Sequence, residues 1–256
     1  MILCTDIGNT NIVLGLFESK DSILPIQKWR LHTNTNLTAD EYSVKLMQLL
    51  EYAKINSTEI EGIIVSSVVP QLDLVFSNVF QKLFNKKVFF VGPGLKSGIK
   101  IKLDNPKQLG ADLLVGAVAA VNKYGAPVIV IDIGTAATIS YINANKEFLG
   151  GVIMPGIKTA YSGLFANTAK LESVKAAKPE KVIGKDTITS IQSGMVFGYA
   201  SMMDGMIKKI KAEQGDAQVV MTGGETRHIL DILEEKVIYD DDLLLEGLKT
   251  LYNKNI

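Results

Sequence analysis

The sequence predicts an α/β protein built from two related halves, and two observations support this prediction. A short motif occurs twice, as Asp6-Ile7-Gly8 after the apolar run 2–4 and as Asp132-Ile133-Gly134 after the apolar run 128–131. The offset of 132 − 6 = 126 residues is close to half of the 256-residue chain. Patterns typical of buried strands also alternate with helical patterns along the sequence, and this alternation favours helices layered on sheets.

Each copy of the motif is expected at the turn of a β-hairpin. In the first half the motif continues into the β-rich stretch 12–17, and in the second half into the stretch 138–142. Two strand patterns separated by a short glycine-containing turn predict a hairpin. Two such turns can arise by chance, but their similar position in each half favours an internal repeat.

The other elements are predicted from caps and periodicity. In the first half they are a helix that opens with the capping box at 38–41, a buried strand that runs into a loop within 62–70, an amphipathic helix at 72–84, a strand at 88–91 and a helix from about 110 to 122. In the second half they are one long helix at 189–211, a strand at 219–221, and helices near 227–233 and 242–251. We expect a domain at 1–115 and another at 116–256, with a nucleotide cleft between them.

Composition narrows the class of protein. Hydrophobic residues make up 47% and charged residues 21%, and Lys+Arg and Asp+Glu are balanced at 27 each, so we expect no nucleic-acid partner. Cys4 is the single cysteine, which rules out a disulfide within the chain. The first residues lack a basic region and a long apolar run, and no later segment reads as a membrane span. We therefore expect no membrane association and a cytoplasmic location.

The first glycine motif offers groups that suit a phosphate and a metal ion. Glycine at a tight turn lets backbone N–H groups approach a phosphate closely, and Asn and Thr side chains supply further donors. The residues assigned here to the nucleotide are Asp6, Gly8, Asn9, Thr10 and Asn11. Asp6 is also a candidate ligand for hydrated Mg²⁺, which prefers one or two carboxylates together with phosphate oxygens. Taken alone, the motif is better explained as a tight turn without a ligand, because glycine-containing turns are common.

The second copy strengthens the phosphate interpretation. Two hairpins facing each other across a cleft could clamp the two ends of a polyphosphate, which supplies the positioning and charge neutralisation that phosphoryl transfer needs. Asp132 brings a second carboxylate for the metal. The residues assigned here to the nucleotide are Gly134, Thr135, Ala136 and Thr138.

A third glycine motif, Thr222-Gly223-Gly224, ends a predicted strand and precedes a predicted helix. The missing side chains leave room for a flat ring or a phosphate, although a plain helix-entry turn is the alternative. Beside the two other motifs, Gly223 and Gly224 are best interpreted as an adenosine contact. The chain has neither a GxxxxGK[ST] P-loop nor a GxGxxG fingerprint after a strand.

This order of phosphate, phosphate and adenosine motifs resembles the actin, hexokinase and heat-shock-protein superfamily, which implies two ribonuclease-H-like halves around a hinged cleft. Within it, a series of segments spanning nearly the whole chain resembles type III pantothenate kinase. These segments are 6–11, 65–70, 91–94, 105–106, 110–112, 150–156, 169–171, 190–194 and 222–224. The resemblance implies ATP-dependent phosphorylation of pantothenate, the first step of coenzyme A synthesis, by a homodimer that uses Mg²⁺ and a monovalent cation, K⁺ or ammonium.

The resemblance also assigns roles on the acceptor side of the reaction. Asp112 matches the catalytic aspartate, within a Gly110-Ala111-Asp112 segment whose Gly110 contacts the substrate. An aspartate at a helix start could instead be an N-cap, and spacing alone leaves both roles open. Thr187 matches a threonine that reaches the substrate of the neighbouring subunit. The apolar residues of the predicted long helix are expected to contribute to that dimer interface; they are Met195, Phe197, Tyr199, Met202 and Met203.

The chain departs from the family at two substrate positions. Leu113 stands where the family has arginine, and Leu103 where it has tyrosine, so two polar contacts to pantothenate are missing. Lys158 or Arg227 could supply the lost charge. Two alternatives to a pantothenate kinase follow: an ATP-binding regulatory homologue with a decayed acceptor site, and a kinase for another small alcohol.

Overall fold

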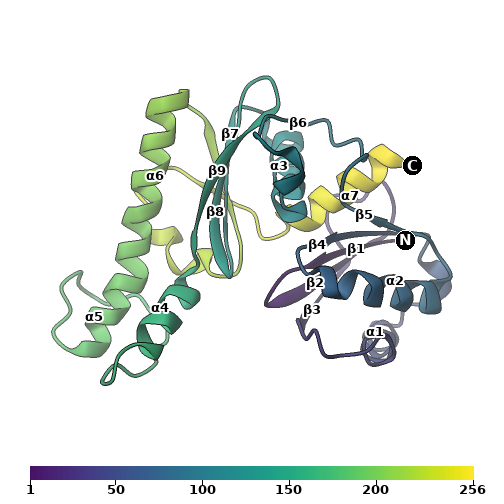
Figure 1. Ribbon diagram of the computed structural model, residues 1–256, viewed down its shortest axis with the longest axis horizontal. Coiled ribbons are helices and arrows are strands. Elements are labelled where there is room, and N and C mark those ends of the chain that lie inside the picture. The colour runs from purple at the N-terminus through teal and green to yellow at the C-terminus, as the bar shows by residue number, and fades with distance from the viewer. The chain divides into compact units, whose positions relative to one another are not determined.

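A computed structural model describes all residues 1–256, and the chain forms two compact units (Figure 1). Unit 1 comprises residues 1–99, 104–122 and 242–256, and unit 2 comprises residues 100–103 and 123–241. Each unit has its own β-sheet, five-stranded in unit 1 and six-stranded in unit 2, and its own hydrophobic core. The predicted α/β class is confirmed.

The sheet of unit 1 has the strand order β3-β2-β1-β4-β5. Its strands are β1 (Ile2–Ile7), β2 (Asn11–Phe17), β3 (Gln27–His32), β4 (Gly62–Ser67) and β5 (Val88–Phe90). Strand β2 runs antiparallel to its neighbours β1 and β3, whereas β1, β4 and β5 run parallel to one another. Because side chains alternate along a strand, Leu3 and Ile7 face one side of this sheet, and Ile2 and Cys4 face the other.

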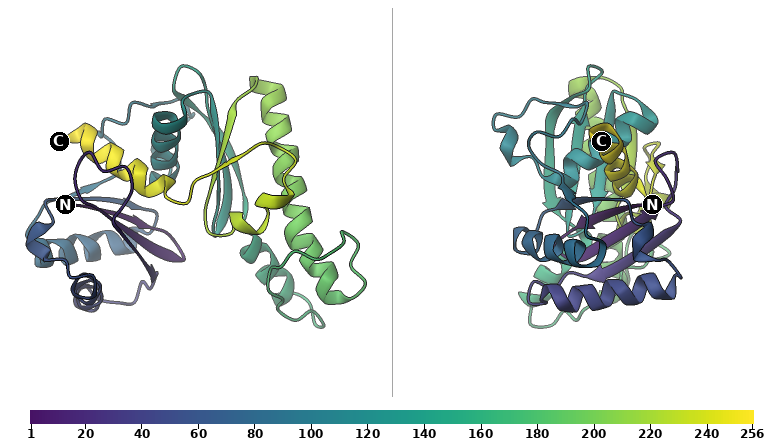
Figure 2. Two further views of the ribbon diagram at one scale, coloured as in Figure 1. Left: turned by 180° about the vertical axis from the view of Figure 1, so that it is seen from behind. Right: turned by 90° about the vertical axis from the view of Figure 1, so that its right-hand side faces the viewer.

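Helices cover both faces of this sheet. Helices α1 (Ala39–Tyr52) and α2 (Pro70–Phe84) lie side by side over the face that carries Leu3 and Ile7 (Figure 2). Helix α1 begins at the predicted capping box, in which Thr38 and Glu41 exchange hydrogen bonds. Helices α3 (Ala111–Tyr124) and α7 (Leu243–Asn255) pack on the opposite face through apolar side chains such as Val115 and Leu248.

The sheet of unit 2 has the order β11-β10-β7-β8-β9-β6. Its strands are β6 (Lys100–Ile101), β7 (Val128–Ile133), β8 (Ala136–Ile142), β9 (Glu147–Pro155), β10 (Gln218–Thr222) and β11 (Ile238–Tyr239). Strands β7, β8 and β9 are antiparallel, and β10 and β11 continue parallel to β7. Apart from β6, this is the pattern of unit 1. Moreover, β1 shifted by 126 residues coincides with β7, so the predicted repeat is a structural one.

The helices of unit 2 lie between strands β9 and β10 in the sequence. Helices α4 (Ile157–Ala166), α5 (Thr187–Ser193) and α6 (Tyr199–Gln214) are joined into one core with the sheet, and α6 runs beside it (Figure 2). The predicted long helix at 189–211 is confirmed, since residues 187–214 are helical without a break and include a π-helical stretch at Gly194–Gly198. A Cβ at Gly194 would lie 2.3 Å from the hydroxyl of Tyr161, so this glycine makes room for α4.

The compact units divide the chain differently from the expected boundary at residue 115. That residue lies inside α3, and the C-terminal segment 242–256 belongs to unit 1 because α7 packs on its sheet. Gly247 permits the close packing of α7 on α3, since a Cβ there would lie 2.4 Å from the carbonyl oxygen of Val115.

The prediction of a helix near 227–233 was wrong. The segment forms two short 3₁₀ turns, Thr226–His228 and Leu230–Ile232. Beyond them the chain bends at Glu234 and Glu235, whose backbone N–H groups donate to the buried carboxylate of Asp204, each at 3.0 Å. Two further 3₁₀ turns lie at Ser57–Glu59 and Pro106–Gln108. No helix combines the length and the apolar character needed to cross a membrane.

Candidate nucleotide and acceptor sites

The first glycine hairpin is held in a fixed shape from two sides. The N–H of Gly8 donates to the carbonyl of Asn11 at 3.0 Å, which closes the turn between β1 and β2. From the end of β3, the Thr33 hydroxyl donates to the Gly8 carbonyl at 2.6 Å, and the Thr33 N–H donates to the Thr10 carbonyl at 2.9 Å. Asn9 and Thr10 are exposed at this turn. Exposed polar groups on a rigid turn are suited to binding an anion.

Asp6 lies just before this turn, in register with Ser66 on the parallel strand β4. Both residues belong to the sheet face that carries Cys4 and Ile64, which is covered by α3 and α7. The Ser66 hydroxyl is buried and has no hydrogen-bond partner. A buried polar group of this kind requires an explanation, and an additional ligand or metal-bound water beside Asp6 would provide one.

The second glycine hairpin repeats this geometry in unit 2. Asp132 lies in register with Thr222 on the parallel strand β10, as Asp6 does with Ser66 on β4. The N–H of Gly134 donates to the Ala136 carbonyl at 2.9 Å. The Thr135 carbonyl accepts from the N–H of Gly156 at 2.9 Å and from the hydroxyl of Thr159 at 2.7 Å, so the start of α4 fixes the turn. Thr135 and Ala136 remain exposed.

The third glycine motif lies directly against the second hairpin. Gly223 has φ +95°, a conformation that favours glycine, and a Cβ there would lie 2.4 Å from Oδ1 of Asp132 and 2.5 Å from the Ile133 carbonyl oxygen. The N–H of Glu225 donates to the same carbonyl at 3.1 Å. The structure therefore brings together two motifs that are 90 residues apart in the sequence (222 − 132 = 90).

The two aspartates have the chemistry that Mg²⁺ requires. Each hairpin contributes one carboxylate, and Mg²⁺ in proteins commonly takes one or two carboxylates and completes its shell with phosphate oxygens and water. No group of three or more His, Cys, Asp or Glu side chains forms a metal cage. Each carboxylate, taken by itself, is a donor of the kind that a hydrated Mg²⁺ accepts.

Asp112 lies in the first turn of α3, which covers the sheet face carrying Asp6. Its Oδ1 accepts a hydrogen bond from the N–H of Leu113 at 2.8 Å. Burial raises the pKa of the Asp112 carboxyl above its ordinary value, although this hydrogen bond acts in the opposite direction. Gly110 leaves room for the carboxylate, since a Cβ there would lie 2.5 Å from Oδ1. Because Asp112 is the second residue of the helix rather than the residue before it, the capping alternative loses its support.

The two leucines at the predicted substrate positions lie in different units. Leu113 is half-buried on α3, and Leu103 lies in unit 2 beside Gly150, where a Cβ would be 3.7 Å from Cδ2 of the leucine. The two candidate replacement cations both have carboxylate partners. Lys158 pairs with Glu225 at 2.6 Å, and Arg227 pairs with Asp241 at 3.1 Å.

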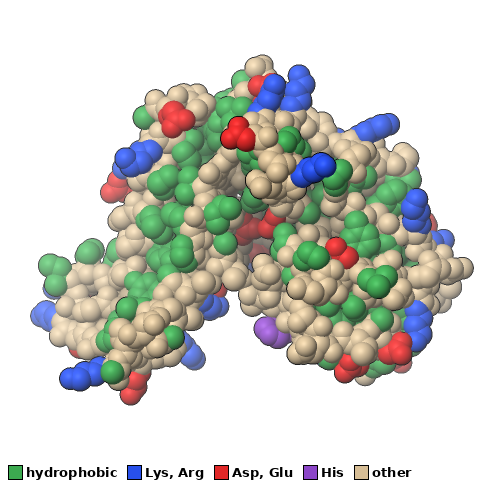
Figure 3. Space-filling view, viewed as in Figure 1, with side chains coloured by type: hydrophobic (Ala, Val, Ile, Leu, Met, Phe, Trp, Pro, Cys, Tyr) green, Lys and Arg blue, Asp and Glu red, His purple; other side chains and the backbone are tan.

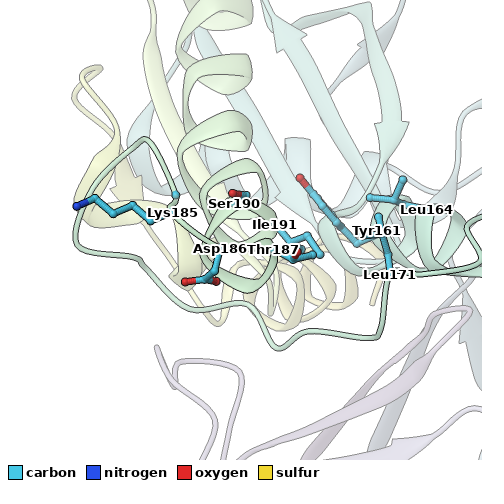
Figure 4. Close-up of a pocket in the computed structure, with 9 residues that line it drawn as sticks. Tyr161, Leu164, Leu171, Lys185, Asp186, Thr187, Ser190 and Ile191 are labelled. Atoms are coloured by element: carbon cyan, nitrogen blue, oxygen red, sulfur yellow. The ribbon is translucent and has the colours of Figure 1, made fainter.

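Thr187 is the first residue of α5 and is exposed, after the N-cap Asp186. It lines a pocket of about 540 Å³ in unit 2. Figure 4 shows residues of α4 and the following loop on one side of this pocket and residues of α5 on the other. The side chains involved include Tyr161, Leu164 and Leu171, and Asp186, Thr187 and Ser190.

The apolar residues expected at a dimer interface divide into two groups. Met195, Tyr199 and Met203 are buried in the core of unit 2, so they are not available to a partner. Phe197 and Met202 are half-buried. A different apolar surface is exposed near the pocket, where hydrophobic side chains are visible over the α4–α5 end of unit 2 (Figure 3). Its members are Leu164, Val182, Ile183 and Ile188.

Solved structures of other proteins share this fold. A Campylobacter jejuni protein assigned to the Baf family of transcriptional activators superposes with a TM-score of 0.57 at 21% identity and covers 98% of this chain and 97% of that one. An inorganic polyphosphate/ATP-glucomannokinase from an Arthrobacter species gives 0.51 at 13% identity, with 98% of each chain covered. With the duplicated sheets, these similarities define the class: a two-unit α/β protein of the actin-like ATPase and sugar kinase fold.

The sequence comparisons identify the family within this class. The family model for type III pantothenate kinase matches residues 2–209. A type III pantothenate kinase from Exiguobacterium sibiricum is 42% identical over 255 residues, which is 100% of both chains. The chain belongs to the type III pantothenate kinase family, and it is a transferase by that membership.

Proposed function

We propose that this chain transfers the γ-phosphate of ATP to the primary hydroxyl of pantothenate, the first step of coenzyme A synthesis. The observation that supports this most strongly is the repeated hairpin, which presents a rigid turn of exposed polar groups next to a carboxylate in each unit. Phosphoryl transfer depends mainly on positioning and on neutralising charge, and such turns supply both together with a metal. Membership in the family supports the choice of pantothenate as the acceptor.

We assign the nucleotide to three segments. The turn that follows Asp6 and the turn that follows Asp132 each receive part of the polyphosphate, and Gly223 and Gly224 receive the adenosine. The packing of Gly223 against Asp132 supports placing the last two on neighbouring parts of one ligand. Asp6 and Asp132 would hold Mg²⁺, which when bound neutralises phosphate charge; K⁺ or ammonium is expected to act beside it.

Asp112 is proposed as the group that orients and deprotonates the pantothenate hydroxyl. Its raised pKa supports this role, because a general base works best when its pKa approaches the operating pH. In the reaction the hydroxyl proton passes to the Asp112 carboxylate, the freed oxygen forms a bond to the γ-phosphorus, and the bond from that phosphorus to the β-γ bridging oxygen breaks to release ADP. Gly110 is proposed to contact pantothenate next to this carboxylate.

We further propose that the active form is a cytoplasmic homodimer in which Thr187 approaches the partner's substrate. The exposed position of Thr187 at a pocket, with an exposed apolar surface nearby, supports an interface at this end of unit 2.

An ADP-release assay with ATP, Mg²⁺ and K⁺ tests the proposal, with pantothenate, its neutral amide analogue and an unrelated primary alcohol compared as acceptors. We expect release with pantothenate and loss of release in the Asp6→Asn variant. Preference for the unrelated alcohol would favour a kinase for another substrate. Nucleotide binding without release for any acceptor would favour a regulatory homologue.

A further inference from the structure

The residues assigned to ATP include no positive charge. The two hairpins contribute Asp6 and Asp132, both negative, and otherwise only glycine, alanine, asparagine and threonine. A nucleoside triphosphate is itself a polyanion, and electrostatic stabilisation of the transferred phosphate is usually a large part of catalysis. A positively charged side chain near one of these turns would complete the site, and the structure offers a candidate in unit 2.

Lys158 and Glu225 form an ion pair whose two members are both attached to the second hairpin. Glu225 follows Gly223 and Gly224, and its N–H donates to the Ile133 carbonyl at 3.1 Å. Lys158 is the second residue of α4, whose N-cap Gly156 donates to the Thr135 carbonyl at 2.9 Å. The backbone contacts on both sides therefore reach the turn at residues 133–135.

The ion pair is unusual because its two members differ in exposure. The Lys158 side chain is 74% exposed, whereas Glu225 is 8% exposed as a residue. Oε1 of the Glu225 carboxylate lies 2.6 Å from Nζ of Lys158, whereas Oε2 is buried and has no hydrogen-bond partner. A buried charge with one unsatisfied oxygen is costly, so its retention calls for a role beyond stability.

We infer that Lys158 is a phosphate-binding residue of the second hairpin, and that Glu225 holds its ammonium group next to the turn. An ammonium group has three donors. One of them serves Glu225, and the exposed side of the group leaves others for the phosphate oxygens of a nucleotide. The inference rests on the proposed function, since it assigns the positive charge to the site in which ATP is placed.

The test compares ADP and adenosine by isothermal titration calorimetry on the full-length protein, with Mg²⁺ present. Loss of a charge-assisted hydrogen bond to phosphate should weaken ADP binding of the Lys158→Met variant by about 10- to 100-fold, with adenosine binding unchanged. Lys158→Arg, which keeps the charge, should retain most of the affinity for ADP. Lys208→Met is the matched control, because Lys208 forms a 2.8 Å pair with Glu234 that is attached to neither hairpin.

A second variant separates binding from folding. Removing Lys158 alone leaves the Glu225 carboxylate buried without its cation, which could destabilise the protein. The Lys158→Met/Glu225→Gln variant removes both charges and should show the same selective loss of ADP binding. Unchanged ADP affinity in this variant would overturn the inference and leave the proposed function standing. Absence of ADP binding by the wild-type protein would overturn both.

Discussion

At the scale of single residues, the setting of Asp112 determines how it can react. Its carboxyl is partly buried at the start of α3, with the N–H of Leu113 as its hydrogen-bond donor at 2.8 Å. Desolvation disfavours the charged form, and this raises the pKa above the ordinary aspartate value of 3.8. The sequence could place an aspartate near a helix start, but the raised pKa follows from packing that no local pattern records.

Replacing Asp112 by asparagine should lower kcat by about 10²- to 10⁴-fold, the usual contribution of a general base. In the wild-type enzyme kcat/KM should rise with pH through the raised pKa, because the deprotonated form is the base; the variant should lose this acidic limb. A pH profile of both proteins measures the effect. Full activity of the variant would remove Asp112 from the mechanism.

The raised pKa of Asp112 also affects the stability of the fold. A carboxyl with a raised pKa binds more protons in the folded than in the unfolded state, so it lowers stability as pH rises from the unfolded toward the folded pKa. At neutral pH the Asp112→Asn variant should therefore have a Tm equal to or above that of the wild type. A clear drop in Tm would show that the carboxylate has a structural role.

The side chain at position 113 is expected to affect how tightly the acceptor binds. A leucine cannot hydrogen-bond a carboxylate, whereas arginine makes charge-assisted and often bidentate contacts to one. Leu113→Arg should lower the KM for pantothenate by about tenfold or more, since such a bond is worth roughly 1.5–3 kcal/mol. Leu113→Met controls for the longer side chain. A fall in activity for the arginine variant would show a pocket adapted to another acceptor.

At the scale of elements, glycine decides how closely the third motif approaches the second hairpin. The motif Thr222-Gly223-Gly224 could be recognised in the sequence, and so could Asp132-Ile133-Gly134. Their direct packing depends on the parallel pairing of β10 with β7, a long-range contact that local patterns do not specify. Glu225 and Thr159 were missed for the same reason, since they become neighbours of the turn only through this packing. Lys158 was considered only as a replacement charge on the acceptor side, and its place beside this turn was not predicted.

Gly223→Ala should destabilise the fold by about 1–3 kcal/mol, because an alanine there is strained at positive φ and its Cβ meets Asp132. Nucleotide binding should weaken with it. Urea denaturation measures the change in the free energy of unfolding. Gly163→Ala is the matched control: Gly163 lies in α4 with no atom within 4 Å of the added Cβ, and alanine should stabilise the helix by about 0.5–1 kcal/mol. Equal effects of both substitutions would contradict the close packing.

At the scale of the whole molecule, the repeat was readable from the sequence, and the division into units was not. Strands β1 and β7 carry the same motif, so the duplication follows from local pattern. The return of α7 to the first unit depends on apolar contacts between residues near 245–251 and strands near 2–4 and 64, which are distant in sequence. Residue 115 was the expected boundary between the two domains, but it lies inside helix α3.

The proposed dimer makes a prediction at this scale. Ile183 is 83% exposed on the apolar surface near the Thr187 pocket, so Ile183→Asp should disrupt self-association. Static light scattering at micromolar concentration should report a dimer for the wild type and a monomer for the variant. Ile23→Asp, at a residue 77% exposed in unit 1, is the control and should remain dimeric. A wild-type monomer would contradict the assignment of Thr187 to a partner's site.

Detection of 4′-phosphopantothenate by mass spectrometry tests the central claim most directly. Purified protein is incubated with ATP, pantothenate, Mg²⁺ and K⁺, beside the Asp112→Asn variant and the Leu113→Arg variant. We expect the wild type to form phosphopantothenate in equal amount to ADP, the asparagine variant to form little or none, and the arginine variant to form it at lower pantothenate concentration. If neither the wild type nor the Leu113→Arg protein forms phosphopantothenate at saturating ATP and pantothenate, the chain is not a pantothenate kinase.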